Sequence, residues 1–246
     1  MRVENSFLGA AGVGERVERT LWEHGVTHWD GFHADVPGVG EARAASVREF
    51  IDAGRQALDD GDARFFADAF PSRAHWRLHD TFDAPCYLDI ETTGLDRHAH
   101  DVTTVTCHRG GETTTLVRGR DLTADALRRE LDAATHLVTY NGAQFDVPFL
   151  ETAFDLSVDL PNVDLLFPCR RLGLTGGLSG VESALGVERD RPDISGRDAV
   201  RLWHEYERGD EDALDTLVAY NREDTVNLAT VADRVVADLD RSVFVG

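Results

Sequence analysis

The sequence of 246 residues contains no lysine, so all 25 of its basic residues are arginine. Asp and Glu together number 45, which gives a formal net charge of −20. Such a surface repels itself at low ionic strength, which suggests a salt-rich cytoplasm. Affinity for phosphates normally comes from cationic side chains, so this charge argues against a broad, nonspecific grip on nucleic acid. A polyanionic partner would need local help, such as bound divalent metal or oriented backbone amides.

Cysteine and long apolar runs are scarce as well. The three cysteines, Cys86, Cys107 and Cys169, form no CxxC pair, so neither a disulfide framework nor a zinc cluster is expected. The sequence has no apolar run of membrane-spanning length, and its start lacks the pattern of a signal peptide. We therefore expect a soluble cytoplasmic protein without membrane contact; no protein partner is identified. At 42% hydrophobic residues the chain can bury a full core.

The first part of the sequence contains an internal repeat. The stretches FLGAAGVGERVERTLWEHGV and FHADVPGVGEARAASVREFI recur at a spacing of 26 residues, read from Gly12 to Gly38. Each resembles a helix-hairpin-helix motif, in which backbone N–H groups at a helix start can hold a phosphate without lysine. The candidate substrate contacts are Gly12, Gly14, Gly38 and Gly40. These glycines could instead merely form tight turns and helix starts, since Glu15 and Glu41 lie where a phosphate would approach.

Strand and helix signals alternate from about residue 85 onward. CYLDIETT, DVTTVTCHR and ETTTLVRG predict three strands, with a Gly110-Gly111 hairpin turn between the last two. Helical spacing in TADALRRELDAAT, a short strand in THLVTYN and a helix in AQFDVPFLETAF follow, and a long helix runs from Glu211 to Leu239. We predict an α/β domain over 85–246 that opens with an antiparallel meander. A connecting segment, 71–84, joins it to a small all-α region over 1–70.

Two acids stand inside the first of these strands, in CYLDIETTGLD. Residues two apart on a strand point the same way, so Asp89 and Glu91 share one face while Leu88 and Ile90 take the other. Two such acids repel each other unless a cation lies between them, and oxygen ligands select hard ions such as Mg²⁺ or Mn²⁺. Taken alone, the pair could equally be solvated acids at a strand end.

Two later segments carry further polar residues in defined settings. In VTYNGAQFDVPFL an Asn-Gly turn follows a strand, and Asp146 lies in the first turn of the next helix, where the helix dipole alone would favour an acid. In AYNREDTVNL, Tyr220 and Asp224 are four residues apart and project from one helix face, a spacing that is also common in simple packing.

In chain order, DxE, N-x3-FD and Y-x3-D resemble the three exonuclease motifs of the DEDD superfamily, in its tyrosine-bearing branch. The likeness is closest to the YprB-like group of ribonuclease-H-like proteins, where lines such as LWEHGVTHWDGF and FFADAFPSRAHWRLHDTFDAPCYLDIETTGL precede the nuclease core. The resemblance implies a ribonuclease-H-like mixed sheet flanked by helices, behind a helix-hairpin-helix-like region. It also implies a 3′–5′ exonuclease that acts on single-stranded or frayed DNA or RNA with a free 3′ end.

The same resemblance implies roles for individual residues. Asp89 would bridge two Mg²⁺ or Mn²⁺ ions roughly 4 Å apart, with Glu91 and Asp224 on the first ion and Asp146 on the second. Tyr220 would orient the attacking water. In the second motif, Asn141 is expected to cap a helix and Phe145 to pack beside the site.

Other residues and functions remain open at this stage. Asp164 resembles a family position but suits a turn or helix start, and Arg170 and Arg171 could meet the substrate backbone or be solvated. His98, His100 and His108 lack metal-ligand spacing and are expected at the surface. The competing functions are a ribonuclease-H-type endonuclease, which would not need the Tyr-Asp pair, and a non-catalytic nucleic-acid or protein-binding module of the same fold.

Overall fold

The computed structural model describes residues 1–244. These residues group into two compact units: Met1–Asp83 with the described part of Val235–Gly246, and Ala84–Arg234. Helix α9 (Glu211–Val243) begins in the second unit and contributes its last turns to the first. The predicted domain limits, 1–70, 71–84 and 85–246, stay a prediction. No helix within residues 1–244 is long and apolar enough to cross a membrane.

The first unit is helical, and each glycine repeat begins a helix in it. Its elements are η1 (Val3–Asn5), α1 (Glu15–Glu23), η2 (Trp29–Gly31), α2 (Glu41–Asp59), α3 (Ala63–Ala69) and η3 (Ser72–Leu78). Aromatic rings form its centre: Phe50 meets Trp29 edge to face at 5.7 Å between ring centroids, and Trp29 stacks on Phe66 at 6.2 Å. Such ring pairs add about 0.5–1.5 kcal/mol beyond the area they bury, so they contribute to this unit's stability.

A buried ion pair completes the interior of the first unit. The guanidinium of Arg77 donates to both carboxylate oxygens of Glu18, at 2.8 and 2.9 Å, and both side chains are 1% exposed. Ser6 Oγ also donates to Glu18, at 2.8 Å. This bidentate arrangement satisfies the charges that burial would otherwise penalise.

The second unit contains a five-stranded mixed sheet flanked by helices, which confirms the predicted fold class. In chain order it consists of β1 (Pro85–Thr92), β2 (Val102–Arg109), β3 (Glu112–Val117), α4 (Ala124–Leu131), β4 (His136–Thr139), α5 (Asp146–Phe154), β5 (Asn162–Asp164), α6 (Leu166–Arg171), α7 (Gly177–Leu185), α8 (Gly196–Glu207) and the first part of α9. The strand order is β3-β2-β1-β4-β5. The first three strands pair antiparallel, as the predicted meander requires, and β4 and β5 add in parallel.

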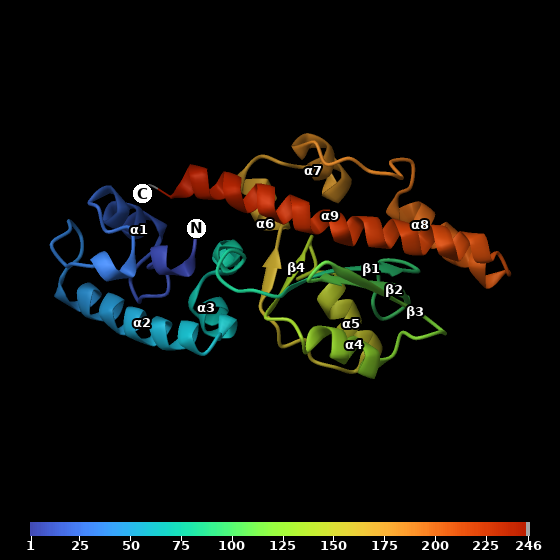
Figure 1. Cartoon of the computed structure of the whole chain (residues 1–246), viewed down its shortest axis with the longest axis horizontal. Helices are drawn as coiled ribbons and strands as arrows, with labels where there is room; N and C mark the ends of the chain where they lie inside the picture. Colours follow the sequence, from blue (N-terminus) through green and yellow to red (C-terminus); the bar gives the residue numbers. More distant parts are fainter. Residues whose placement is uncertain (245–246) are drawn as a thin grey trace. The chain divides into compact units, whose positions relative to one another are not determined.

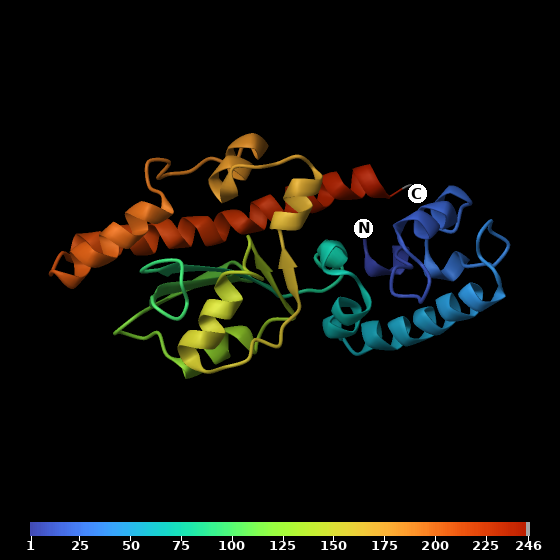
Figure 2. The same ribbon diagram turned by 180° about the vertical axis from the view of Figure 1, so that it is seen from behind.

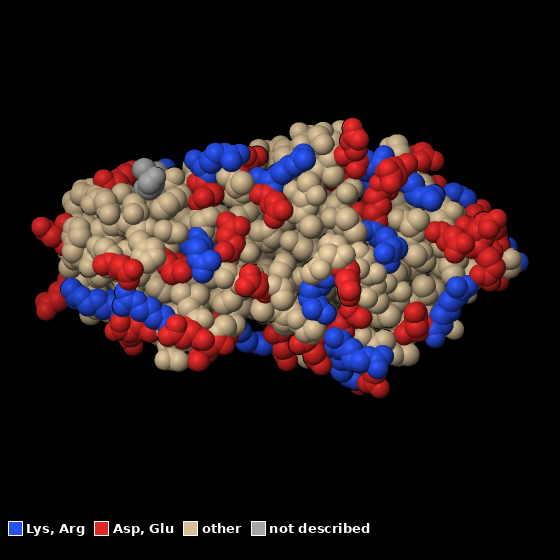
Figure 3. Space-filling model, in the orientation of Figure 1, with Lys and Arg blue, Asp and Glu red and all other residues tan. Residues whose placement is uncertain are grey.

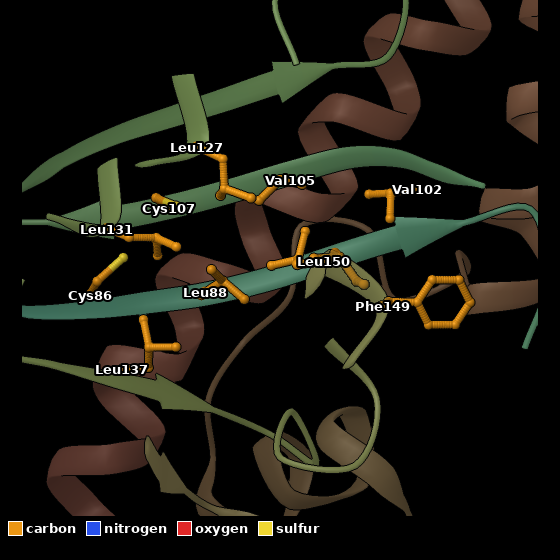
Figure 4. Close-up of a cluster of buried hydrophobic side chains, with 11 residues drawn as sticks. Cys86, Leu88, Val102, Val105, Cys107, Leu127, Leu131, Leu137, Phe149 and Leu150 are labelled. Atoms are coloured by element: carbon orange, nitrogen blue, oxygen red, sulfur yellow. The ribbon is translucent and has the colours of Figure 1, made fainter. Parts of the chain in front are cut away.

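Helices cover both faces of this sheet. Figure 1 shows α4 and α5 on one face and α9 on the other, and Figure 2 shows the same layers from behind. On the α4–α5 face, apolar side chains of β1 and β2 pack against Leu127 and Leu131 of α4 and against Phe149 and Leu150 of α5 (Figure 4). On the other side, α8 packs along α9 through apolar side chains such as Trp203 and Leu217.

Two elements differ from the sequence prediction. Strand β5 was not predicted, because three residues are too few to show an alternation of apolar and polar side chains. The long helix continues to Val243 rather than ending at Leu239. The three cysteines are free and buried, in line with the expected lack of a disulfide framework.

Candidate metal centre

Strand β1 places Asp89 and Glu91 on the sheet face opposite the α4–α5 core. Leu88 and Ile90, which alternate with them, are 0% and 5% exposed and belong to that core. The two acids stay only partly buried on their own face. Their strand partners in β2 are Thr106 opposite Asp89 and Thr104 opposite Glu91, so hydroxyls rather than cations flank them within the sheet.

Helix α9 brings a third acid to this pair. One carboxylate oxygen from each of Asp89, Glu91 and Asp224 lies within 4.8 Å of the other two. Tyr220 lies one turn before Asp224 on the same helix face, is 7% exposed, and its hydroxyl hydrogen-bonds to Asp224. Segments more than 100 residues apart in sequence therefore meet at the face of β1 that α9 covers.

Asp146 is the fourth acid of the cluster. It is the first residue of α5 and is 4% exposed, and the backbone N–H groups of Asp146 and Ile90 bond its carboxylate. It lies near enough to Asp89 and Glu91 for its charge to raise the pKa of both. The second motif thus supplies an acid to the same site, beside the group of three oxygens.

The four carboxylates are buried or partly buried close to one another, so their negative charges repel. Burial raises the pKa of Asp89 and of Glu91 well above the usual range, and the neighbouring carboxylates raise both further. Burial also raises the pKa of Asp146 to about 7 and that of Asp224 to about 6. A donor set of carboxylate oxygens without cysteine or histidine suits a hard divalent cation, and such an ion would offset this repulsion.

These pKa shifts predict how stability varies with pH when metal is chelated. The folded pKa values of about 7 for Asp146 and about 6 for Asp224 exceed the unfolded value of 3.8. Because the folded protein holds these protons more tightly, the resulting stability is present below about pH 4 and is lost as the pH rises through 6 and 7. We expect the melting temperature in EDTA and constant salt to fall between pH 5 and 8.

Two comparisons check that interpretation. Asp146→Asn should flatten the slope in EDTA, because the side chain no longer titrates. Adding Mn²⁺ should reverse it, because metal binding requires deprotonated carboxylates. A wild-type melting temperature that rises from pH 5 to 8 in EDTA would contradict the raised pKa values of this cluster.

Arg189 is a site residue that sequence reasoning missed. Its guanidinium donates to Asp224 and to Glu182, and it lies over the Tyr220 ring, 5.5 Å from the ring centroid. The Arg189 and Glu182 side chains are 8% and 0% exposed, and Asn227 Nδ2 donates to Glu182 at 2.9 Å. The loop sequence VERDRPD between α7 and α8 looks like a solvated charge run, so no local signal identifies this buried cation.

Asn221 is the second residue that was missed. It directly follows Tyr220, is fully buried, and donates from Nδ2 to Asp89 Oδ2 at 2.6 Å. Asn221 and Thr225, four apart on the helix, form a polar pair on the side of α9 that faces the sheet. That pair inside an otherwise apolar stripe was the available signal.

The second motif needs one correction. Asn141 caps no helix: the N-cap of α5 is Phe145, without a side-chain cap bond, and Asn141 takes a left-handed backbone conformation with φ 66°. Asp164 stabilises that turn, because its carboxylate accepts from the N–H groups of Asn141 at 2.7 Å and Ala143 at 3.1 Å. Asp164 itself is the last residue of β5 and also accepts from the N–H of Leu166, the first residue of α6, at 3.0 Å, in line with its predicted place at a turn or helix start.

The remaining sequence candidates lie as follows. Phe145 packs against Phe149, with ring centroids 4.8 Å apart, beside Asp146. Arg170 is exposed and lines an open cavity of about 340 Å³ with Asn141. Both sequence-based alternatives for it, a contact with the substrate backbone and a solvated position, stay open. His98 and His100 are exposed, and His108 is partly buried with a bond to Thr113.

The two glycine turns of the first unit meet at one place. Gly12 and Gly38 have positive φ, whereas Gly14 and Gly40 are the N-caps of α1 and α2. Arg43 ties the turns together by donating to the carbonyls of Gly12, at 2.9 Å, and of Gly38. An open cavity of about 600 Å³ lies there, lined by Gly12, Gly40 and Arg43 among others. A phosphate contact at these glycines stays a prediction.

Solved structures of other proteins resemble this chain over about two thirds of its length. No curated protein matches the chain. A nuclease solved in its apo form is 19% identical, with a TM-score of 0.47, over 65% of this chain and 74% of its own. The family B DNA polymerase from the hyperthermophilic archaeon Pyrobaculum calidifontis is also 19% identical, with a TM-score of 0.47. That match covers 63% of this chain but only 27% of the polymerase.

A family model covers the sheet and the acidic cluster together. Residues 86–236, more than half of the sequence, match the model described as the RNase_H superfamily. This segment contains β1 through most of α9, and with them all four acids and Tyr220. The chain therefore belongs to the RNase_H superfamily.

Proposed function

We propose that this chain is a metal-dependent 3′–5′ exonuclease of the DEDD superfamily, in its tyrosine-bearing branch and closest to the YprB-like group. What supports this is the meeting of four carboxylates and one tyrosine, from DxE, N-x3-FD and Y-x3-D, around strand β1 of a superfamily sheet. A ribonuclease-H-type endonuclease would not need Tyr220 to bond Asp224 beside Asp89 and Glu91.

Asp89, Glu91, Asp146 and Asp224 would hold two divalent ions, Mg²⁺ or Mn²⁺. When bound, such ions activate the attacking water and neutralise the charge that develops on the leaving 3′ oxygen. The ions would also offset the mutual repulsion of the carboxylates. That repulsion, together with the larger effect of burial, raises the pKa of Asp89 and Glu91.

Tyr220 supplies a hydrogen-bond donor, which ionised carboxylates lack. Burial, and then the charge of Asp224, raise the pKa of its phenol far above neutrality, so the hydroxyl keeps its proton at working pH. A protonated phenol held by Asp224 and by the Arg189 cation over its ring can orient the water that attacks the phosphorus. We assign it that positioning role.

A net charge of −20 disfavours further contacts with a nucleic acid. Figure 3 shows Asp and Glu interspersed with Arg over the visible face, and acids gather over the turn between α8 and α9. That turn, with the residues beside it, contains Glu205, Glu207, Asp210, Glu211 and Asp212. A strand would therefore be held mainly at the metal centre, with the glycine turns near Gly12 and Gly38 as a sequence-independent second contact.

The deciding assay uses labelled single-stranded DNA and RNA with Mn²⁺ in high salt. We expect mononucleotides to be released from a free 3′ end, no release from a strand whose 3′ end is blocked, and no cutting of a circular single strand. Parallel reactions on DNA and RNA report the sugar preference. Cutting of the circle would instead favour the endonuclease, and binding without any cleavage would favour the non-catalytic module.

A further inference from the structure

Asn221 connects the acidic cluster to the interior of the sheet. Its Nδ2 donates to Asp89 Oδ2 at 2.6 Å, and its Oδ1 accepts from Thr104 Oγ1 at 3.0 Å and from Thr106 Oγ1 at 2.6 Å. Asn221, Thr104 and Thr106 are all fully buried. The two threonines are the β2 strand partners of Glu91 and Asp89, so they share the sheet face of the acids.

The bonding chemistry fixes which way this amide points. An ionised carboxylate, the form that binds metal, only accepts hydrogen bonds, so the NH₂ group of Asn221 faces Asp89. The amide oxygen then faces β2, where two hydroxyls donate to it, and Thr106 shares a further bond of 2.9 Å with Thr115 on β3. A flipped amide would put two oxygens against each other at Asp89, which is unfavourable in a buried setting.

We propose that Asn221 is the positioning residue for Asp89 and that the Thr104–Thr106 pair locks its amide. The bond to Oδ2 sets the rotation of the Asp89 carboxylate, one oxygen of which lies within 4.8 Å of oxygens of Glu91 and Asp224. This inference rests on the proposed function, because it assigns a partner to the carboxylate expected to bridge both ions. Partners of metal-binding carboxylates typically change metal affinity or activity by about 10- to 100-fold when they are removed.

The test is Mn²⁺ binding to Asn221→Leu, which keeps the approximate shape of the side chain and loses both of its bonds. Calorimetry without substrate should show affinity weakened by about 10- to 100-fold, and kcat on a saturating strand should fall while KM changes little. Thr225→Val is the matched control. It removes a buried hydroxyl on the same helix that bonds the backbone carbonyl of Asn221 at 2.7 Å, and it should bind Mn²⁺ like the wild type.

A second variant keeps the inference testable if Asn221→Leu does not fold. Thr106→Val leaves Asn221 in place and removes one of the two donors that orient its amide, so Mn²⁺ affinity should fall by a smaller factor. Wild-type Mn²⁺ affinity in a folded Asn221→Leu or in Thr106→Val would overturn the positioning role while leaving the proposed function intact. A wild-type protein that binds no Mn²⁺ would overturn both.

Discussion

Asp89→Asn is expected to remove nuclease activity and the response to metal together. The side chain keeps its shape, but its amide cannot serve as an anionic bridge between two ions. Turnover should fall by more than about 100-fold, which is the upper end of the loss seen when only the partners of metal ligands are changed. The measurement is release of mononucleotides from a 3′-labelled strand at saturating Mn²⁺.

Thermal melts of the same variant separate metal binding from folding. In EDTA, Asp89→Asn should melt at or above the wild-type temperature, because it deletes a carboxylate whose pKa is raised by burial and by its acidic neighbours. With Mn²⁺ at a hundred times its dissociation constant, the wild type should gain about 2.7 kcal/mol, and Asp89→Asn should gain little of this. Asp125→Asn, whose side chain is 87% exposed on α4, should behave like the wild type throughout. A variant that retains the full Mn²⁺ gain would exclude Asp89 as the bridge.

Arg189→Met is expected to destabilise the protein strongly when metal is chelated. The substitution leaves Glu182 and Asp224 without the cation that they share, and these two side chains are 0% and 9% exposed. Breaking a buried pair in this way typically costs about 3–5 kcal/mol. The melting temperature in EDTA reports the loss, and Mn²⁺ should stabilise the variant more than the wild type, because a divalent ion beside Asp224 replaces the missing charge.

Two further variants make that result specific. Adding Glu182→Gln to Arg189→Met should recover part of the stability, because one of the two orphaned charges is removed. Arg201→Met is the matched control, since Arg201 also bonds two acids, Asp198 and Glu205, but is 55% exposed. Such surface pairs contribute about 0–1 kcal/mol, so this control should melt near the wild type. If Arg189→Met melts there as well, Arg189 does not hold the cluster.

The sequence predicted the acids of this site better than the groups that hold them. Asp89 and Glu91 were placed on one face because side chains two residues apart on a strand point the same way. Tyr220 and Asp224 were placed on one face because residues four apart on a helix lie on the same side. Asn221 and Arg189 were missed because their partners are distant in the sequence. Asn221 lies 132 residues from its partner Asp89, and Arg189 lies 35 residues from its partner Asp224. A local pattern can mark a buried polar residue such as Asn221, but it does not identify the distant partner.

The turn chemistry was only partly predictable. Asp164 was expected at a turn or helix start, and it ends β5 and accepts from the N–H of Leu166, because short acids readily bond nearby N–H groups. Asn141 was expected to cap a helix, yet the same property of asparagine also favours the left-handed turn that it adopts. The choice between these outcomes depends on Asp164, which sits on a separate strand.

Helix α9 limits how this protein could be divided into exchangeable modules. Its Tyr220 and Asp224 belong to the unit Ala84–Arg234, whereas the helix from Val235 onward belongs to the compact unit built on Met1–Asp83. Val235, Val236, Leu239 and Val243 are buried. A fragment that starts at residue 84 would therefore carry an apolar helix end stripped of its packing partners. Recombination between Asp83 and Ala84 would therefore not yield a self-contained folding unit. A gene duplication or fusion would have to carry both units together.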